Sequence, residues 1–225
     1  MNFCFILITV LISVGLALVM YRFSARKVKI FQTCMFVPYF ISWVVASYVV
    51  YALLCPDIGA LSILCKNLGL SIPNFYNTPQ YWRIIMPVAY LWKNVGYMTL
   101  LYYATLLGME THLLEAAAID GATEKQRIWY IMLPFLKPTI VLMVLLQVGK
   151  IFNADFGMFY FLPRNSGTLY PVTDVIDTYV YRALRVTGDV GMASAMGLFQ
   201  TIAGFTILYV INSVVRKIDR DNALY

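Results

Sequence analysis

Residues 3–21 read FCFILITVLISVGLALVMY, a run of 19 residues without a charged side chain. A helix needs about 20 mostly apolar residues to cross the hydrocarbon core of a bilayer, so this run predicts a membrane-spanning helix. No basic stretch precedes it and no small-residue cleavage site follows it, which argues against a secretory signal peptide.

The rest of the chain continues this pattern. Of its 225 residues, 61% are hydrophobic and 12% are charged, whereas soluble domains average about 45–50% apolar and about 25% charged residues. Four more apolar runs predict spans at 33–54, 81–107, 138–162 and 194–215. We therefore expect an all-α fold: one membrane domain over residues 1–225, a bundle of about five transmembrane helices with no soluble domain attached.

The positions of the basic residues predict the orientation, because Lys and Arg are enriched in cytoplasmic segments. The segments after the first, third and fifth spans carry ten of them: Arg22, Arg26, Lys27, Lys29, Lys125, Arg127, Lys137, Arg216, Lys217 and Arg220. The other two connecting segments carry four: Lys66, Arg164, Arg182 and Arg185. We therefore expect the N-terminus outside and the C-terminus in the cytoplasm.

Several functional classes find no support in the sequence. The net charge of +6 comes from basic residues at the ends of apolar runs, so it does not indicate a nucleic-acid partner. One His and no CxxC pair make a metal site improbable, and the sequence has neither H-E-x-x-H nor G-x-S-x-G. Cys55 and Cys65 share one external segment, so they are either thiols or a disulfide pair.

The segment 108–137 is too long for a simple connection, and long loops are usually functional. Residues 113–120 are rich in helix-forming Ala, Leu and Glu, and Gly121 follows as a helix stop. Thr123 and Gln126 have the spacing of a capping box that starts a second helix. We expect that helix to end before Pro134, and Pro138 to open the fourth span.

This segment resembles the signature of ABC importer permeases, E-A-A-x3-G-x9-I-x-L-P. Every specified position agrees: Glu115, Ala116, Ala117, Gly121, Ile131, Leu133 and Pro134. The resemblance implies that the loop is a coupling helix that docks on a separate ATP-binding subunit, with these residues and Asp120 at the contact. The chain has no G-x-x-x-x-G-K-[ST] loop. We therefore expect it to be a non-catalytic subunit with no cofactor of its own, and ATP to be used by the partner.

The resemblance extends over most of the chain. The stretches 36–45 (FVPYFISWVV), 156–167 (FGMFYFLPRNSG) and 174–182 (DVIDTYVYR) are similar to the oligosaccharide and polysaccharide branch of these permeases. It implies import of a sugar across the bacterial inner membrane, with a pair of ATPase subunits, a second related permease, an extracytoplasmic solute-binding protein and membrane lipid as partners. Members of this branch carry one span more, so we expect the first span of the family to be missing here: either the native start lies upstream of Met1, or this is a shortened form.

Polar residues inside the predicted fourth span are candidates for the substrate path, because ionisable groups are costly within a membrane. On a continuous helix, Gln147, Lys150 and Asn153 or Asp155 fall on one broad face. Their donors and acceptors suit sugar hydroxyls, and the aromatic rings of Phe152, Phe156 and Tyr160 suit sugar faces. The alternative is that Lys150 and Asp155 form a structural pair. In the third span, Lys93 and Asn94 beside Gly96 predict a close helix contact.

Two other functions stay open on the sequence alone. Asp155 and Lys150 could relay ions in a secondary transporter driven by an ion gradient. Against that reading, the five spans do not divide into the repeated halves that such transporters often have. The chain could also be an assembly protein that transports nothing.

Overall fold

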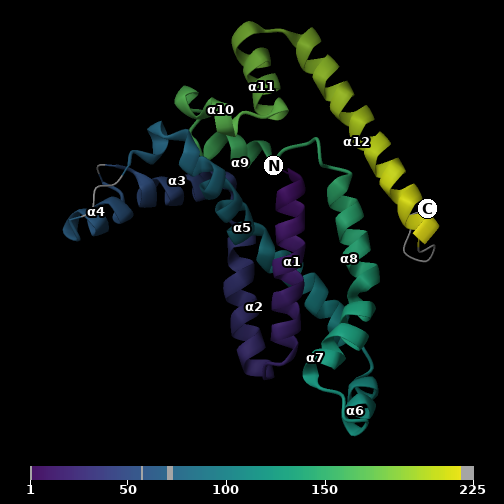
Figure 1. Cartoon of the computed structure of the whole chain (residues 1–225). Coiled ribbons are helices and arrows are strands. Elements are labelled where there is room, and N and C mark those ends of the chain that lie inside the picture. The colour runs from purple at the N-terminus through teal and green to yellow at the C-terminus, as the bar shows by residue number, and fades with distance from the viewer. Residues whose placement is uncertain (1, 57, 70–72, 219–225) are drawn as a thin grey trace. The chain divides into compact units, whose positions relative to one another are not determined.

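The computed structural model describes residues 2–56, 58–69 and 73–218, and this part of the chain consists of helices joined by turns and loops, without a strand (Figure 1). The predicted all-α class is confirmed. The chain divides into two compact units. The first comprises Met1–Tyr39, Trp92–Lys150 and Phe205–Tyr225, and the second comprises Phe40–Leu91 and Ile151–Gly204. Two long helices, α5 (Pro79–Leu107) and α12 (Val190–Ile218), contribute to both units.

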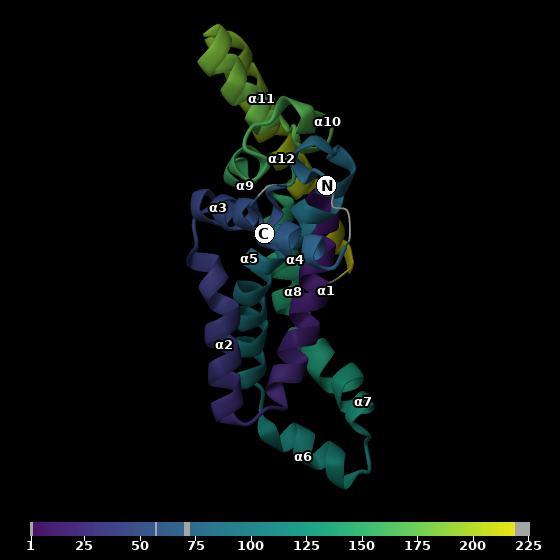
Figure 2. The ribbon, with the colours of Figure 1, turned by 90° about the vertical axis from the view of Figure 1, so that its left-hand side faces the viewer.

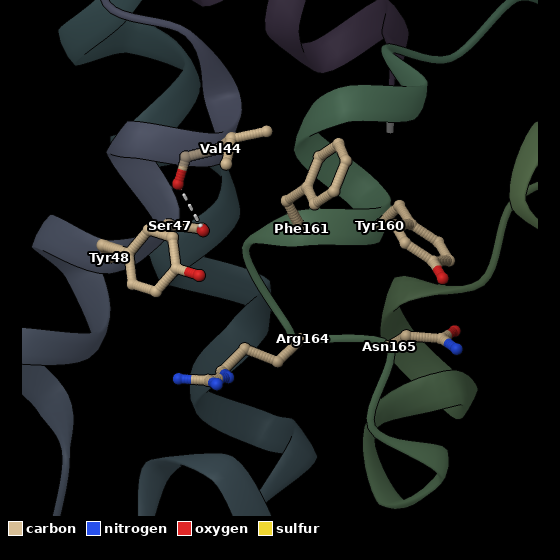
Figure 3. A pocket seen from close by; sticks show the side chains of 7 residues that line it. All are labelled: Val44, Ser47, Tyr48, Tyr160, Phe161, Arg164 and Asn165. Atoms are coloured by element: carbon tan, nitrogen blue, oxygen red, sulfur yellow. Dashed lines mark hydrogen bonds between the residues drawn. The ribbon is translucent and has the colours of Figure 1, made fainter.

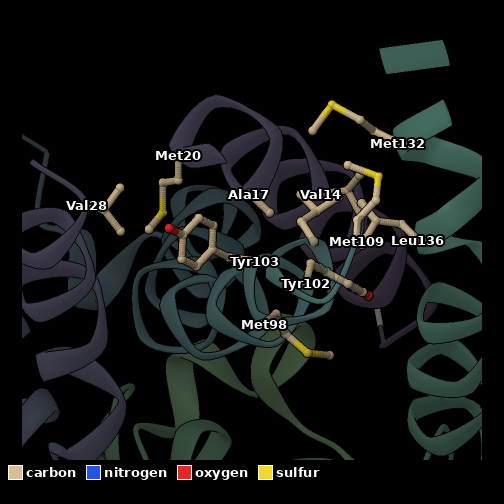
Figure 4. Close-up of a cluster of buried hydrophobic side chains, with 11 residues drawn as sticks. Val14, Ala17, Met20, Val28, Met98, Tyr102, Tyr103, Met109, Met132 and Leu136 are labelled. Atoms are coloured by element: carbon tan, nitrogen blue, oxygen red, sulfur yellow. The ribbon is translucent and has the colours of Figure 1, made fainter. Parts of the chain in front are cut away.

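A cluster of buried apolar side chains holds the first unit together (Figure 4). Most of it comes from α1 (Asn2–Tyr21), α5 and the segment that leads into α8 (Leu133–Val148). Its members are Val14, Ala17, Met20, Val28, Met98, Tyr102, Tyr103, Leu106, Met109, Met132 and Leu136. Lipid tails are as apolar as these side chains, so the cluster is stabilised by close packing and not by exclusion from water.

Small residues let helices of this unit approach closely. A Cβ built on Gly96 of α5 would lie 1.8 Å from the carbonyl oxygen of Met35 in α2 (Ala25–Phe40). On the α1 side, the buried Ser13 hydroxyl donates to the Val95 carbonyl at 3.3 Å. Lys93 donates to the Tyr39 carbonyl at 2.9 Å, beside stacked Tyr39 and Tyr97 rings whose centroids are 4.6 Å apart. The predicted helix contact at Gly96 is therefore confirmed.

The predicted second span, 33–54, is not one straight helix. After α2 the chain bends by 102° and continues as α3 (Trp43–Leu54). Ser42 lies at the bend in an extended conformation, and its hydroxyl accepts from the Val45 N–H at 3.3 Å. This cap satisfies one of the amides that a new helix leaves without a partner.

The helix that follows the 108–137 turn does not end before Pro134, contrary to the prediction. It runs through α7 (Glu124–Arg127), a π-helical segment η2 (Ile128–Met132) and α8, so Pro138 lies inside a helix and does not open one. Proline lacks an N–H and its ring clashes with the carbonyl four residues earlier. The π register avoids this conflict: the Leu133 N–H donates to the Ile128 carbonyl, five residues back.

The predicted fourth span, 138–162, is also broken. The helix ends at Val148, residues 149–155 form turns, and the chain resumes as the short helix α9 (Phe156–Phe161). The polar residues that were predicted to share one face of a helix therefore lie at the end of α8 and in the turn after it. Gln147 belongs to the first unit, whereas Asn153 and Asp155 belong to the second.

The second unit consists of short helices. Besides α3 and α9, it contains α4 (Ala60–Asn67), η1 (Phe75–Asn77), η3 (Gly167–Leu169), α10 (Tyr170–Thr173), α11 (Ile176–Arg182) and the π-helical η4 (Ala183–Thr187). α9 packs on α3 where Gly157 meets the Trp43 side chain, which a Cβ would approach to 2.7 Å. Cys55 and Cys65, both in the described part of the chain, form no disulfide with each other.

Three helical segments of the described residues are long and apolar enough to cross a membrane: Asn2–Tyr21, Glu124–Val148 and Val190–Lys217. The bent pair α2 and α3 would make a fourth if it counts as one span. The first and last of the three contain the predicted spans 3–21 and 194–215 almost completely. α5 covers the predicted 81–107, but polar residues such as Arg83 and Lys93 lower its hydropathy, so its crossing stays a prediction.

The close approach at Gly96 can be tested by adding a single methyl group. Gly96→Ala must displace the backbone of α2, so we expect a loss of about 1–3 kcal/mol or more, the usual range for overpacking. Gly15→Ala in α1 is the matched control, because nothing lies within 4 Å of its Cβ position. Thermal unfolding of the purified chain in detergent measures both. An unchanged midpoint for Gly96→Ala would contradict the described packing of α2 on α5.

Candidate functional site

The signature loop begins with α6 (Thr111–Ile119), which ends in a Schellman turn. The Ala122 N–H donates to the Ala117 carbonyl at 2.9 Å, and the Gly121 N–H donates to the Ala118 carbonyl at 3.1 Å. Gly121 has φ +79°, the left-handed conformation that this motif places at its turning residue and that glycine adopts at least cost. The predicted helix stop at Gly121 is confirmed.

The next helix starts at the predicted capping box. Gln126 Oε1 accepts from the Thr123 N–H at 2.7 Å, and the Gln126 N–H donates to the Thr123 hydroxyl at 3.4 Å. Glu124 also forms an ion pair with Arg22, in the turn between α1 and α2. Both partners are more than half exposed, so the pair positions the loop more than it stabilises it. Figure 2 shows α6 beyond the end where α1 meets α2, and α7 beside the lower end of α1.

The signature residues divide into a mostly exposed group before the turn and a later group of which two members are partly buried. Glu115, Ala116, Asp120 and Gly121 are exposed and Ala117 is half-buried. Next to them, the Ile119 side chain is 87% exposed. Farther along the chain, Ile131 and Leu133 pack against the buried cluster of the first unit, where Met132 is a member. Pro134 is exposed.

This arrangement joins a surface to a core through one continuous helix. α6 presents a short face of small and apolar side chains around a single carboxylate, Glu115. The segment after Gly121 enters the core within three turns, at Met132 and Leu136. A turn thus connects the exposed α6 to a continuous helix that enters the packed interior of the first unit.

The three tentative path residues do not lie on one continuous helix. Gln147 is half-buried in α8, and its Nε2 is buried without a hydrogen-bond partner among the described residues. Asn153 is exposed in the turn after α8. Asp155 starts α9 as its N-cap, with Oδ1 accepting from the Met158 N–H at 3.3 Å. The continuous polar face expected on one helix is not formed.

Asp155 has a structural partner, but it is not Lys150. The indole N–H of Trp43, a buried side chain at the start of α3, donates to the other carboxylate oxygen of Asp155. A hydrogen bond to an ionised acceptor is roughly twice as strong as a neutral one. Asp155 therefore links α3 to α9 while it caps α9, which is a structural role through Trp43 and not through the predicted pair with Lys150.

A second network of hydrogen bonds, which was not predicted from the sequence, holds the turn between α8 and α9. Asp177 Oδ2 accepts from the Ala154 N–H at 2.8 Å and from the Gln200 side chain at 3.3 Å. Gln200, a buried residue of α12, also donates to the Phe152 carbonyl at 2.9 Å. The sequence feature that could have predicted this network is Gln200, a glutamine inside an apolar span, because its amide must find hydrogen-bond partners in the membrane.

A double-mutant cycle tests whether Asp155 acts through Trp43. Trp43→Phe removes the donor and Asp155→Ala removes the acceptor of one hydrogen bond, so we expect their effects on thermal stability to be non-additive, by about 1 kcal/mol. Trp82→Phe with Asp155→Ala is the control, because the Trp82 indole donates to the Phe75 carbonyl. Additivity within about 0.5 kcal/mol in the first cycle would contradict the linkage.

The chain is similar to sugar-related transport proteins. It is 28% identical over 190 residues to Protein LplB of Bacillus subtilis, covering 84% of this chain and 59% of that protein. It is 30% identical over 189 residues to the polygalacturonan/rhamnogalacturonan transport system permease protein YteP of the same organism, covering 84% and 58%. The chain thus spans less than two thirds of the length of these relatives.

Solved structures show the same fold. A crystal structure of a bacterial ABC transporter involved in the import of the acidic polysaccharide alginate contains a chain with TM-score 0.89 and 29% identity, covering 97% of this chain and 77% of that one. A second, of a bacterial alginate ABC transporter in complex with an alginate pentasaccharide-bound periplasmic protein, gives TM-score 0.88 and 28% identity, covering 96% and 76%.

The family described as binding-protein-dependent transport system inner membrane component matches residues 10–222, which is nearly the whole chain. That description agrees with the apolar helices and with the loop whose signature residues lie on the surface and against the core. The chain is a helical, multi-pass membrane protein that belongs to this family of transport permeases.

Proposed function

We propose that this chain is a pore-forming subunit of an ATP-driven, binding-protein-dependent importer, and that its substrate is an oligosaccharide. The observation that carries the proposal is the signature loop. Its exposed residues offer a docking face on α6, and Ile131 and Leu133, which are partly buried, pack against the core of the first unit. A loop with only a structural role would have little reason to leave Ile119 87% exposed.

In this proposal α6 is the coupling helix. Ala116 and Ala118 carry only methyl groups, so a partner surface can approach the helix closely, and Glu115 can meet a basic or N–H donor group. Asp120 and Gly121 set the turn that points the helix outward. Movement of the docked subunit reaches the interior through α7, η2 and α8, and it ends at the packed Ile131 and Leu133.

The ATPase is a separate subunit. The chain offers no phosphate-binding loop, so we infer that it binds no nucleotide or other cofactor and that a pair of partner subunits hydrolyses ATP. A second, related permease would complete the pore, and an extracytoplasmic solute-binding protein would deliver the substrate. The similarity to a transporter solved in complex with a pentasaccharide-bound periplasmic protein supports the last partner. The C-terminus would lie in the cytoplasm with the loop.

A sugar substrate is supported by the names of the relatives and by the polar groups at the end of α8. Polygalacturonan, rhamnogalacturonan and alginate are carbohydrates named for the similar proteins. Gln147 has a buried amide nitrogen with no partner among the described residues, and it can donate to a sugar hydroxyl. We keep Gln147, Asn153 and Asp155 as proposed path residues, with Asp155 positioned by Trp43.

The hydrogen bonds of Asp155 also bear on the two alternative functions, a secondary transporter and an assembly protein. A carboxylate that caps a helix and accepts an indole N–H is poorly placed to relay ions, which weighs against a secondary transporter. An assembly role without transport would leave the exposed residues of the signature loop without a purpose. We therefore retain the importer.

Reversal of the Glu115 charge tests docking directly. We expect Glu115→Lys to reduce recovery of the ATP-binding subunit by about tenfold or more in affinity purification from native membranes, because a docking contact would turn into repulsion. Glu110→Lys is the matched control: it makes the same charge change at an exposed position of the same loop, outside the signature. Mass spectrometry identifies the recovered partners.

The two variants separate the outcomes. Loss of the ATPase with Glu115→Lys but not with Glu110→Lys supports docking at the signature. Recovery of the chain alone from the wild type, or of partners that ignore the Glu115 change, would contradict the importer.

A further inference from the structure

A pocket of about 270 Å³ lies within the second unit (Figure 3). One wall comes from α3 and the other from α9 and the loop after it. Its lining residues are Val44, Ser47, Tyr48, Tyr160, Phe161, Arg164 and Asn165. Pockets for small ligands begin at about 300 Å³, so this volume suits a single ring better than a long chain.

The lining combines aromatic faces with hydrogen-bonding groups. Tyr48, Tyr160 and Phe161 offer flat surfaces and two hydroxyls, and Tyr160 is held by stacking on Phe156 at 5.0 Å between centroids. Asn165 Oδ1 accepts from the Tyr170 hydroxyl at 3.0 Å, which fixes the amide and leaves its N–H groups for a ligand. Apolar faces with a few placed donors and acceptors are typical of sites for small polar molecules.

Arg164 supplies the only charge in the lining, and no acidic residue accompanies it. Its guanidinium lies 4.2 Å from the centre of the Tyr51 ring and forms no ion pair with a described residue. In Figure 3 the side chain extends from its loop toward α3, beneath Tyr48. The stacking holds the guanidinium in place while its N–H groups stay available to an anionic partner.

The backbone that presents this arginine is unusual. Arg164 and Asn165 have φ values of +56° and +50°, two consecutive non-glycine residues in the left-handed region. Such a conformation costs about 1–2 kcal/mol for an ordinary residue. It persists here because the loop is tied on both sides: the Asn165 N–H donates to the Tyr160 carbonyl at 3.1 Å, and the Ser166 N–H donates to the Pro163 carbonyl at 3.1 Å.

Tyr76 lies near Arg164, so its ionisation state decides whether it neutralises the charge of the guanidinium. Burial raises the pKa of the Tyr76 hydroxyl to about 12, and the nearby Arg164 guanidinium acts in the opposite direction. Tyr76 therefore stays a neutral phenol at physiological pH. It does not compensate the charge of Arg164, which remains for a ligand.

We propose that this pocket binds one sugar unit of the transported oligosaccharide and that Arg164 selects a unit bearing a carboxylate, as in a uronic acid. The aromatic side chains would lie against the ring, Asn165 and the tyrosine hydroxyls would bind its hydroxyls, and the guanidinium would pair with the carboxylate in a bidentate contact. This inference rests on the proposed function for its sugar substrate, and it adds a site and a charge preference.

The test is a titration of the full chain in lipid nanodiscs with two probes of the same shape. Digalacturonate carries carboxylates, and its methyl ester is neutral. We expect the acid to bind about tenfold to a hundredfold more tightly at low salt, the range for a hydrogen bond to a charged group. Isothermal titration calorimetry measures both dissociation constants on the wild type alone, so this comparison needs no variant to fold.

Arg164→Asn then tests the residue. Asparagine tolerates the left-handed backbone, so the change removes the charge without adding strain. It should weaken binding of the acid by about tenfold or more and leave binding of the ester unchanged. Arg83→Asn, an exposed arginine of α5 outside the pocket, is the control and should change neither.

Several results would overturn the site: equal affinity of the wild type for acid and ester, no binding of either at millimolar concentration, or an Arg164→Asn variant that binds the acid as the wild type does. Because the titration uses this chain alone, its failure is separate from a failure of ATPase docking. A chain that recovers the ATPase but does not prefer the acid would remain an importer without this subsite.

Discussion

Pro134 has no N–H to donate, and its ring crowds the carbonyl four residues earlier, yet the helical run from Glu124 to Val148 continues through it. The π register at Ile128–Met132 makes this possible, because the Leu133 N–H reaches back five residues to Ile128. The helix that starts at Glu124, shortly after the turn at Gly121, therefore continues into the core at Leu136.

The second constraint is the demand of a membrane environment that every backbone polar group find a partner. At two of the interruptions between its helices, a side chain meets that demand. Ser42 caps α3 at the 102° bend, and Asp155 caps α9 after the turn that ends α8. The same turn is held through Ala154 by Asp177. These interruptions give the second unit its short helices and its pocket, which straight spans would not provide.

Local signals in the sequence predicted the parts of the structure that local forces determine. The helix 81–107, the stop at Gly121 and the capping box at Thr123 all depend on residues within one turn of each other, and all are present. The family signature could be recognised for the same reason, because its residues lie within one short segment of the sequence. The break after Val148 was missed because it depends on distant partners, such as Trp43 for Asp155 and Gln200 for Asp177. The break at Ser42 was missed although its cap is local, from the Val45 N–H to the Ser42 hydroxyl. Pro134 was misjudged because a π turn leaves no mark in the sequence.

A photo-crosslinking amino acid at position 119 tests directly whether α6 docks on an ATP-binding subunit. Ile119 is 87% exposed on α6, and Phe205, 66% exposed on α12, serves as the comparison position. In native membranes the account predicts a crosslink from position 119 to an ATP-binding subunit and none from position 205. A crosslink from 119 only to lipid or to the chain itself, with its partner subunits present, would contradict the account.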